Sequence, residues 1–417
     1  MSDRPSSLRT PGFLGGVLGT AFTVAVGFGL IVPALPAFAR ELGASVGATS
    51  AVISTFAAVR LVAVGPAGAI ADRVGARITV ATGLVLVAAS SAATALADRY
   101  MELVFLRGAG GLGSALFITG LGQYLVVAIP ARERGRANGL LHGAFLLGGA
   151  SGPAVGGLVI EAVGIRAPFV IYAVTLLIAT AVTLNYLRPL PTLARDRGGQ
   201  VVQLEDSPPR LEATGAHGTG RGGSAIGALV RDRTFLAILG VHAVVSWGSQ
   251  GVRFVGIPLF GEEILGATPG QVGLALATAS VTHGMLLWPA SHVTDRHGRL
   301  LPVRVGTAVF ALALAGLATT STVPMLFVWM AVQGVATGAT STVPAAMVGD
   351  LAPAGVEGRA VGAMNVARDV GAIAGPLVTG VVADLFGFPA AFGLAAILLG
   401  AGFAATFAMR ETLPASR

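Results

Sequence analysis

The chain has 417 residues, of which 54% are hydrophobic and only 11% are charged. Soluble domains carry about 25% charged residues, so this composition predicts an integral membrane protein. Cysteine is absent, which excludes disulfides and thiolate metal sites. The sequence also lacks a nucleophile–base constellation, a metal-ligand cluster and a phosphate loop with lysine, so we expect neither an enzyme, nor a metal, nor a cofactor.

Long apolar runs follow one another along the chain. A helix that crosses a bilayer needs about 20 mostly apolar residues, whereas barrel strands alternate over about ten. The first run is too long for a signal peptide. The runs predict twelve transmembrane helices, at 12–37, 46–70, 78–97, 101–129, 138–161, 167–187, 234–259, 269–292, 301–320, 323–349, 360–384 and 387–409.

The arginines indicate the orientation of these helices. With the N-terminus inside, the outer loops hold Arg40, Arg99 and Arg166, and most other arginines fall in the inner segments. This bias follows the positive-inside rule and predicts a plasma-membrane protein with both termini cytoplasmic. The net charge of +7 therefore marks a membrane face, and we expect no nucleic acid partner.

Residues 189–233 interrupt the apolar rhythm. They are polar and rich in Pro, Gly and Arg, which is typical of a cytoplasmic linker. The chain is thus predicted to comprise an N-terminal six-helix half (1–188), this linker (189–233) and a C-terminal six-helix half (234–417).

The two halves repeat each other at a constant offset of 223 positions. "ADRVGAR" at 71–77 has a counterpart in "TDRHGRL" at 294–300. Pro66 corresponds to Pro289, and "PARERGRANG" at 130–139 corresponds to "PAGVEGRAVG" at 353–362. Because each unit has an even number of helices, the units are parallel repeats about an axis along the membrane normal.

Twelve helices in two repeats, a long central loop and a duplicated Asp-Arg-x-Gly turn resemble the major facilitator superfamily. The resemblance implies an all-helical membrane fold and secondary transport by alternating access. Its turn pattern after helix 2 is G-x-x-x-D-R-x-G-R-[RK], and Ala76 is the departure here. The matching and repeated latch positions are Asp72, Arg73, Gly75, Arg77, Asp295, Arg296 and Gly298.

The resemblance also implies a role for the carboxylate of Asp72. An anion is stabilised at a helix N-terminus, and Asp72 is expected to dock at the start of helix 11, near 358–362, as a latch between the halves. The alternative is that the arginines of the turn only signal topology.

A second phrase, "GLLHGAFLLGGASGPAVGG" at 139–157, resembles the helix 5 motif of the drug–proton antiporter group. Small residues at this spacing allow close helix contact, which is also the alternative interpretation of the motif. We expect Gly152 to face helix 8. The glycine and proline positions of this packing motif and its repeat are Gly139, Gly148, Gly152, Pro153, Gly156, Gly157, Gly371, Gly375 and Pro376.

Ionisable residues inside spans are functional candidates because their burial in the membrane is costly. The candidates for proton coupling are Asp369, Arg60, Arg107 and His283. Asp369 is a carboxylate well inside a span, and matching depths predict an ion pair with Arg60. The alternative is local pairing of Asp369 with Arg368 or Asn365.

Polar and aromatic residues on helices 4, 7 and 10 are candidates for the substrate cavity, namely Gln123, Tyr124, Trp247, Gln250, Trp329 and Gln333. Their low charge favours a neutral or amphipathic small molecule. The leading hypothesis is a monomeric proton-coupled exporter of small organic or drug-like molecules, with protons and the lipid bilayer as its other partners. The alternatives are a nutrient or metabolite symporter or uniporter on the same fold, and a membrane sensor that does not transport.

Overall fold

The computed structural model describes residues 11–129, 131–187, 194–195, 201–202, 227, 229–341, 343–353 and 356–413. Side chains are described for all of these except 11–14, 131–132, 134–135, 194–195, 201–202, 288, 295 and 297. Twelve helices in this part of the chain are long and apolar enough to cross a membrane, which confirms the predicted number. The chain is therefore a multi-pass membrane protein.

The first six spans are single helices. They are α1 (Pro11–Glu41), α2 (Val46–Val74), α3 (Ala76–Thr94), α4 (Tyr100–Ala128), α5 (Ala131–Val163) and α6 (Ala167–Tyr186). A two-residue antiparallel pairing of β1 (Ala194–Arg195) with β2 (Val201–Val202) follows within the predicted linker.

The seventh span is built from several segments. They are α8 (Arg233–Trp247), the π-helical η2 (Gly248–Gly256), α9 (Ile257–Leu259) and the π-helical η3 (Phe260–Ile264). The remaining spans are α10 (Pro269–His297), α11 (Leu300–Ala318), α12 (Val323–Thr340) with α13 (Val343–Leu351), α14 (Glu357–Phe386), and α15 (Phe388–Ala405) with the 3-10 turn η4 (Thr406–Ala408).

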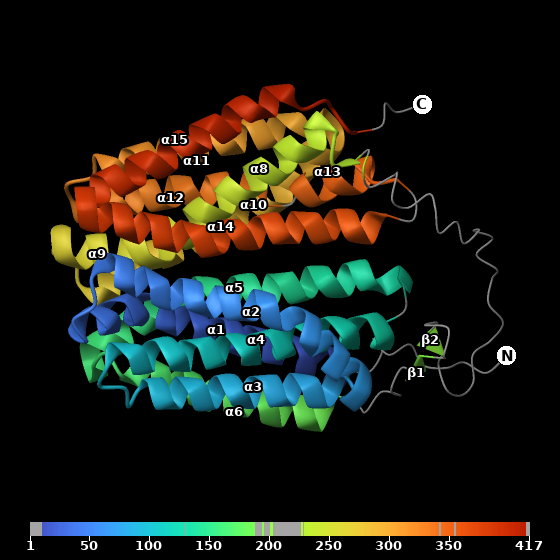
Figure 1. Cartoon of the computed structure of the whole chain (residues 1–417), viewed down its shortest axis with the longest axis horizontal. Coiled ribbons are helices and arrows are strands. Elements are labelled where there is room, and N and C mark those ends of the chain that lie inside the picture. The colour runs from blue at the N-terminus through green and yellow to red at the C-terminus, as the bar shows by residue number, and fades with distance from the viewer. Residues whose placement is uncertain are drawn as a thin grey trace. The chain divides into compact units, whose positions relative to one another are not determined.

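The chain forms two compact units. The first comprises residues 1–31, 55–152 and 166–216. Here α3 packs against α4 and α6 (Figure 1), with small residues at the contact. A Cβ added at Gly83 would lie 2.5 Å from the backbone nitrogen of Phe117, so the two helices touch through their backbones.

The second unit comprises residues 32–54, 153–165 and 217–417. In it α11 packs between α12 and α15, and α14 packs against α8 (Figure 1). Phe260, Phe388 and Phe392 form an aromatic cluster, with the rings of Phe260 and Phe392 edge to face at 5.2 Å. The boundary between the units falls inside α1, α2 and α5.

Both Asp-Arg-x-Gly turns are tight. Gly75, with φ of 86°, is the single residue between α2 and α3. Gly298, with φ of 99°, follows α10 directly. A residue with a side chain is strained at such φ values, which explains the glycine at both positions.

The seventh span departs from the regular helix expected over 234–259. Its π-helical segment η2 lies against α14, where a Cβ at Gly251 would collide with the backbone of Gly375. A wider π turn places an extra residue in the helix, and such turns are frequent at functional sites. Hydropathy alone does not show this change, because both helix types are equally apolar.

Candidate functional site

Asp369 lies buried in the middle of α14. Its carboxylate accepts hydrogen bonds from Arg368, at 3.0 Å from Nη2 and 3.2 Å from Nε. The Asp369 side chain is 12% exposed, whereas that of Arg368 is 49% exposed. The local pairing with Arg368, one of the two alternatives left open by the sequence, is therefore present. Arg60 and Asp369 belong to different units, and their pairing stays a prediction.

Helix α8 approaches the Asp369 site closely. The Ser246 hydroxyl donates to the carbonyl oxygen of Arg368 at 2.7 Å. A Cβ at Gly371 would collide with the carbonyl oxygen of Ala243. The absence of a side chain at Gly371 therefore lets α8 touch α14 within a turn of Asp369.

Arg60 of α2 and Arg107 of α4 both lie near the point where these two helices cross in the first unit. Arg107 is 2% exposed, and its guanidinium carbon lies 4.9 Å from the centre of the Phe56 ring. Within the described part of the chain, its Nε and Nη1 atoms make no hydrogen bond. A Cβ added at Gly111 would lie 2.5 Å from the Phe56 carbonyl oxygen and 3.3 Å from the backbone nitrogen of Arg60. The ring of Phe56 thus supplies a cation–π contact to a buried cation.

The fourth proton-coupling candidate, His283, lies on α10 in the second unit. A Cβ at Gly338 of α12 would be 2.8 Å from the His283 carbonyl oxygen, so the two helices are in close contact there. The structure therefore brings Arg60 and Arg107 together and places His283 and Asp369 in the other unit.

The cavity candidates of the second unit divide into two kinds. The amide of Gln333 and the indole nitrogen of Trp247 are buried and find no hydrogen-bond partner among the described residues. Gln250 lies in the π-helical η2. Trp329 instead lies with its ring against Gly316 of α11, where any Cβ would overlap the ring. Trp329 thus fills the contact between α12 and α11.

The two cavity candidates of the first unit are Gln123 and Tyr124, and their role in a cavity stays a prediction. The side-chain nitrogen of Gln123 donates to the Asp72 carboxylate at 2.8 Å. Tyr124 is fully buried in the unit. Gln123 is therefore a partner of the turn, and the sequence held no signal for this because the two residues are 51 positions apart.

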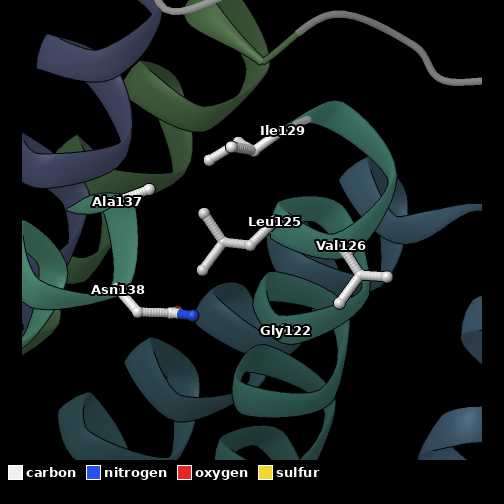
Figure 2. A pocket seen from close by; sticks show the side chains of 6 residues that line it. All are labelled: Gly122, Leu125, Val126, Ile129, Ala137 and Asn138. Atoms are coloured by element: carbon white, nitrogen blue, oxygen red, sulfur yellow. The ribbon is translucent and has the colours of Figure 1, made fainter. Parts of the chain in front are cut away.

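A small pocket of about 200 Å³ lies just beyond Gln123, between the adjoining ends of α4 and α5. Figure 2 shows the Asn138 side chain pointing across it toward α4 near Gly122. Apolar side chains form most of the wall, which is lined by Gly122, Leu125, Val126, Ile129, Ala137 and Asn138. Its size suits a few water molecules rather than an organic substrate.

The other latch candidates surround the two turns. Arg77 donates to the carbonyl oxygen of Leu184 at the end of α6. Arg73 and Arg296 are exposed. The side chain of Asp295 lies outside the described residues. The docking of Asp72 on helix 11 would join the two units and stays a prediction.

The second turn is capped by a residue that sequence reasoning missed. Glu411 accepts hydrogen bonds from the backbone nitrogens of Arg299 at 2.9 Å and Leu300 at 3.1 Å, at the start of α11. It also accepts from Thr412 and Leu413 in its own segment. Partial burial opposes ionisation of Glu411, but these four N–H donors outweigh it and lower its pKa below the ordinary value of 4.5. A lone Glu after the last span gives no pattern that predicts this contact.

The glycines of the helix 5 motif contact α1. A Cβ at Gly152 would lie 2.5 Å from the Val26 carbonyl oxygen, and one at Gly148 would lie 2.6 Å from Ala25 Cβ. The expectation that Gly152 faces helix 8 is wrong. Helix 8, which is α10, instead meets α5 at Pro153, where a Cβ added at Gly273 would collide with the Pro153 carbonyl oxygen. Successive residues of a helix point in directions about 100° apart, so Gly152 and Pro153 face different helices.

The repeat of this motif behaves in the same way. A Cβ at Gly375 would lie 2.9 Å from Trp247 Cα, so Gly371 and Gly375 hold α14 against α8. Pro376 directly follows this contact, and Gly156 is buried within α5. Gly139 faces open space, so it has no packing role among the described residues.

The sequence comparisons identify the family. The Major Facilitator Superfamily model matches residues 17–267 and 243–417. An uncharacterized MFS-type transporter of Methanocaldococcus jannaschii is 21% identical over 91% of this chain and 93% of its own length. The quinolone resistance protein NorA of Staphylococcus aureus is 25% identical over 36% of this chain and 38% of its own length.

The fold is shared with solved transporters. A bacterial homolog of the human lysosomal transporter Spinster, in an inward-facing and occupied conformation, has a TM-score of 0.77 at 13% identity over 97% of each chain. The human organic anion transporter MFSD10 has a TM-score of 0.63 at 15% identity, over 97% of this chain and all of its own. These likenesses confirm the predicted all-helical fold. The chain belongs to the major facilitator superfamily.

Proposed function

We propose that this protein is a proton-coupled exporter of small amphipathic organic molecules in the plasma membrane. Its family is one of secondary transporters, and the proposal adds the coupling ion, the direction and the substrate class. The observation that carries the coupling is the burial of Asp369. Among the described residues it is the one Asp or Glu that is buried, with 9% of the whole residue exposed.

A carboxylate at this depth is costly unless it is paired with a cation or protonated. Arg368 supplies the cation. Because its side chain is 49% exposed, the guanidinium can move away from a protonated Asp369 and remain solvated. Protonation of Asp369 removes the anion and releases Arg368. The backbone carbonyl of Arg368 accepts a hydrogen bond from Ser246 of α8, and we propose that this neighbouring contact transmits the release to the packing of α14 on α8.

The buried amide of Gln333 and the indole of Trp247 support the substrate class. Buried polar groups without a partner are rare in folded proteins, because each costs about 1–3 kcal/mol. We propose that the transported molecule forms hydrogen bonds with these groups, which have no partner among the described residues. These neutral groups suit an amphipathic molecule, and the likeness to NorA in one part of the chain agrees with export of drug-like compounds.

We further propose that the protein acts as a monomer with both termini in the cytoplasm. The bias of arginines toward one set of loops supports this orientation. A membrane-impermeant label applied to intact cells, directed at cysteines placed in the linker or in an outer loop, tests it. Labelling of the linker from outside contradicts the orientation.

The coupling is tested in proteoliposomes with an imposed proton gradient. A panel of fluorescent dyes and neutral drug-like compounds is screened while a lumenal pH dye follows proton movement. We expect gradient-driven transport with protons moving against the compound. Compound and protons moving in the same direction indicate a symporter, and transport without proton movement indicates a uniporter; both overturn the proposal.

Asp369→Asn is the decisive variant. It is expected to lose gradient-driven transport while keeping exchange of labelled for unlabelled compound, because exchange needs no net proton release. Glu102→Gln is the matched control, since Glu102 is an exposed acid at the start of α4. Undiminished proton-driven transport by Asp369→Asn contradicts its role as the proton carrier.

A further inference from the structure

An ion pair joins the end of α1 to the end of the seventh span. Arg40 Nε lies 2.7 Å from Glu263 Oε1, and Arg40 Nη2 lies 3.4 Å from Oε2. Arg40 also donates to the carbonyl oxygen of Ala44 at 2.7 Å. The two charged residues are 223 positions apart, which is the offset between the repeats. A contact between equivalent positions of two repeats must lie at the axis that relates them.

A carboxylate from α14 caps the start of α2. Asp384 accepts hydrogen bonds from the Ser45 hydroxyl at 2.6 Å, the Val46 nitrogen at 2.9 Å and the Gly47 nitrogen at 2.7 Å. These backbone groups have no partner within their own helix. The positive end of the α2 dipole adds to the attraction.

The same contact occurs a second time, in the other repeat. Glu161 at the end of α5 accepts from the Gly270 nitrogen at 2.9 Å, at the start of α10, and bonds the Thr268 side chain. The two caps are related by the repeat offset of 223 positions: Glu161 corresponds to Asp384. Thr268 and Gly270 correspond in the same way to Ser45 and Gly47. Pro269 has no N–H, so this copy lacks the bond that Val46 makes.

Glycines make both caps possible. A Cβ at Gly47 would lie 2.8 Å from Asp384 Oδ2, and one at Gly270 would lie 2.8 Å from Glu161 Oε1. A side chain at either position displaces the carboxylate. The equivalence therefore extends from the charged groups to the small residues that admit them.

We propose that these three contacts act together as a gate, which we name the twofold clasp: Arg40–Glu263, Glu161 on α10, and Asp384 on α2. All of its residues lie in the second compact unit, where the ends of α1, α2 and α5 adhere to the second repeat. The clasp closes the helix ends opposite the Asp-Arg-x-Gly turns. It must open for substrate to pass there, an inference that rests on the proposed transport cycle.

The clasp is built to open. The Arg40 and Glu263 side chains remain 37% and 32% exposed. A pocket of about 570 Å³ beside them is lined by further charged groups, including Glu41 and Glu262. Water therefore reaches the ion pair and can replace its partners when it separates, unlike a buried pair, whose separation is strongly unfavourable.

The absence of native cysteine allows a test that needs no substrate. An Ala44→Cys reporter, at a site only 6% exposed, is labelled with a maleimide in nanodiscs. Arg40→Glu and Glu263→Arg should each raise the labelling rate about fivefold, because each replaces a partly exposed ion pair with a contact between like charges. The exchanged pair, Arg40→Glu with Glu263→Arg, should return the rate to that of the reporter alone.

The caps are tested with the same reporter. Asp384→Asn and Glu161→Gln should each raise labelling, and the double variant should raise it further. Control substitutions at Asp98 and Arg166, an exposed ion pair at 2.9 Å within the first unit, should leave it unchanged. Unchanged labelling in folded Arg40→Glu and Asp384→Asn, or no recovery in the exchanged pair, overturns the clasp.

A cross-link provides a second measurement if a charge variant does not fold. Cysteines at Arg40 and Glu263, joined by a short thiol-reversible crosslinker, should block transport of a fluorescent dye until reduction. The same crosslink between positions 98 and 166 should not. Full transport with the first crosslink in place overturns the gate, whereas a failure of dye transport in the parent protein counts only against the proposed function, because labelling is read without substrate.

Discussion

Gly152 tests whether the close contact between α5 and α1 is required. A Cβ added there would lie 2.5 Å from the Val26 carbonyl oxygen and 2.6 Å from Gly29 Cα. Ordinary van der Waals contact begins near 3.4 Å, so Gly152→Ala must separate the two helices by about 0.9 Å. Both obstructing atoms belong to the backbone, so no side-chain rotation relieves the overlap.

The cost follows from two opposing effects. Overpacking of a well-packed contact costs about 1–3 kcal/mol. Replacing Gly by Ala inside a helix favours folding by about 1 kcal/mol. Because rigid backbone is the obstacle, we expect Gly152→Ala to lower the free energy of unfolding by about 1–2 kcal/mol. Gly152→Leu should lose transport while the protein is still made.

Thermal unfolding in detergent, followed by tryptophan fluorescence and by size-exclusion chromatography, measures the effect. Gly143→Ala is the matched control, because Gly143 lies on the same helix with no atom within 4 Å of its added Cβ. The control should be unchanged or slightly more stable. If Gly152→Ala is as stable as Gly143→Ala, the two helices do not need this contact.

Four further substitutions probe three other sites. Asp72→Asn should cut dye transport sharply at unchanged expression, and Gln123→Ala should cut it less, because Gln123 only holds the carboxylate within its own unit; equal activity of Asp72→Asn and wild type in vesicles removes the latch. The Glu411 cap, whose pKa is lowered on folding, should be intact above the ordinary value of 4.5 and be lost as pH falls through the lower folded value. Hydrogen exchange of the first α11 amides should show this loss in wild type, and in Glu411→Gln these amides should be unprotected at every pH. If their protection changes neither with pH nor with the substitution, the cap is contradicted. Arg107→Lys should lower stability by about 1 kcal/mol, measured by unfolding, because lysine keeps the charge but not the planar stack on Phe56; an unchanged midpoint contradicts the stacking.

The number and type of the membrane-crossing elements follow from the amino-acid sequence alone. Spans follow from the length and hydropathy of each run, which are local properties set by the thickness of the bilayer. The sequence also predicts tight turns at Gly75 and Gly298. Each glycine lies in a connection of one or two residues that requires positive φ. The family resemblance rested on these same local patterns.

Which residues contact one another, by contrast, depends on how the helices pack in three dimensions. The helices are apolar on all sides, so no hydrophobic stripe tells a lipid-facing side from a packed one. For this reason the sequence predicts helix 8 as the neighbour of Gly152, which in fact touches α1, and it does not predict the hydrogen bond between Gln123 and Asp72. Trp329 packs on Gly316 for a reason equally invisible along the chain.

The twofold clasp lies between these two cases. The offset of 223 already related Arg40 to Glu263 and Glu161 to Asp384 in the sequence. Equivalence between repeats does not imply contact, because equivalent residues touch only near the axis that relates the repeats. The fold places these helix ends at that axis, so the repeat forms one ion pair and two helix caps that the sequence did not predict.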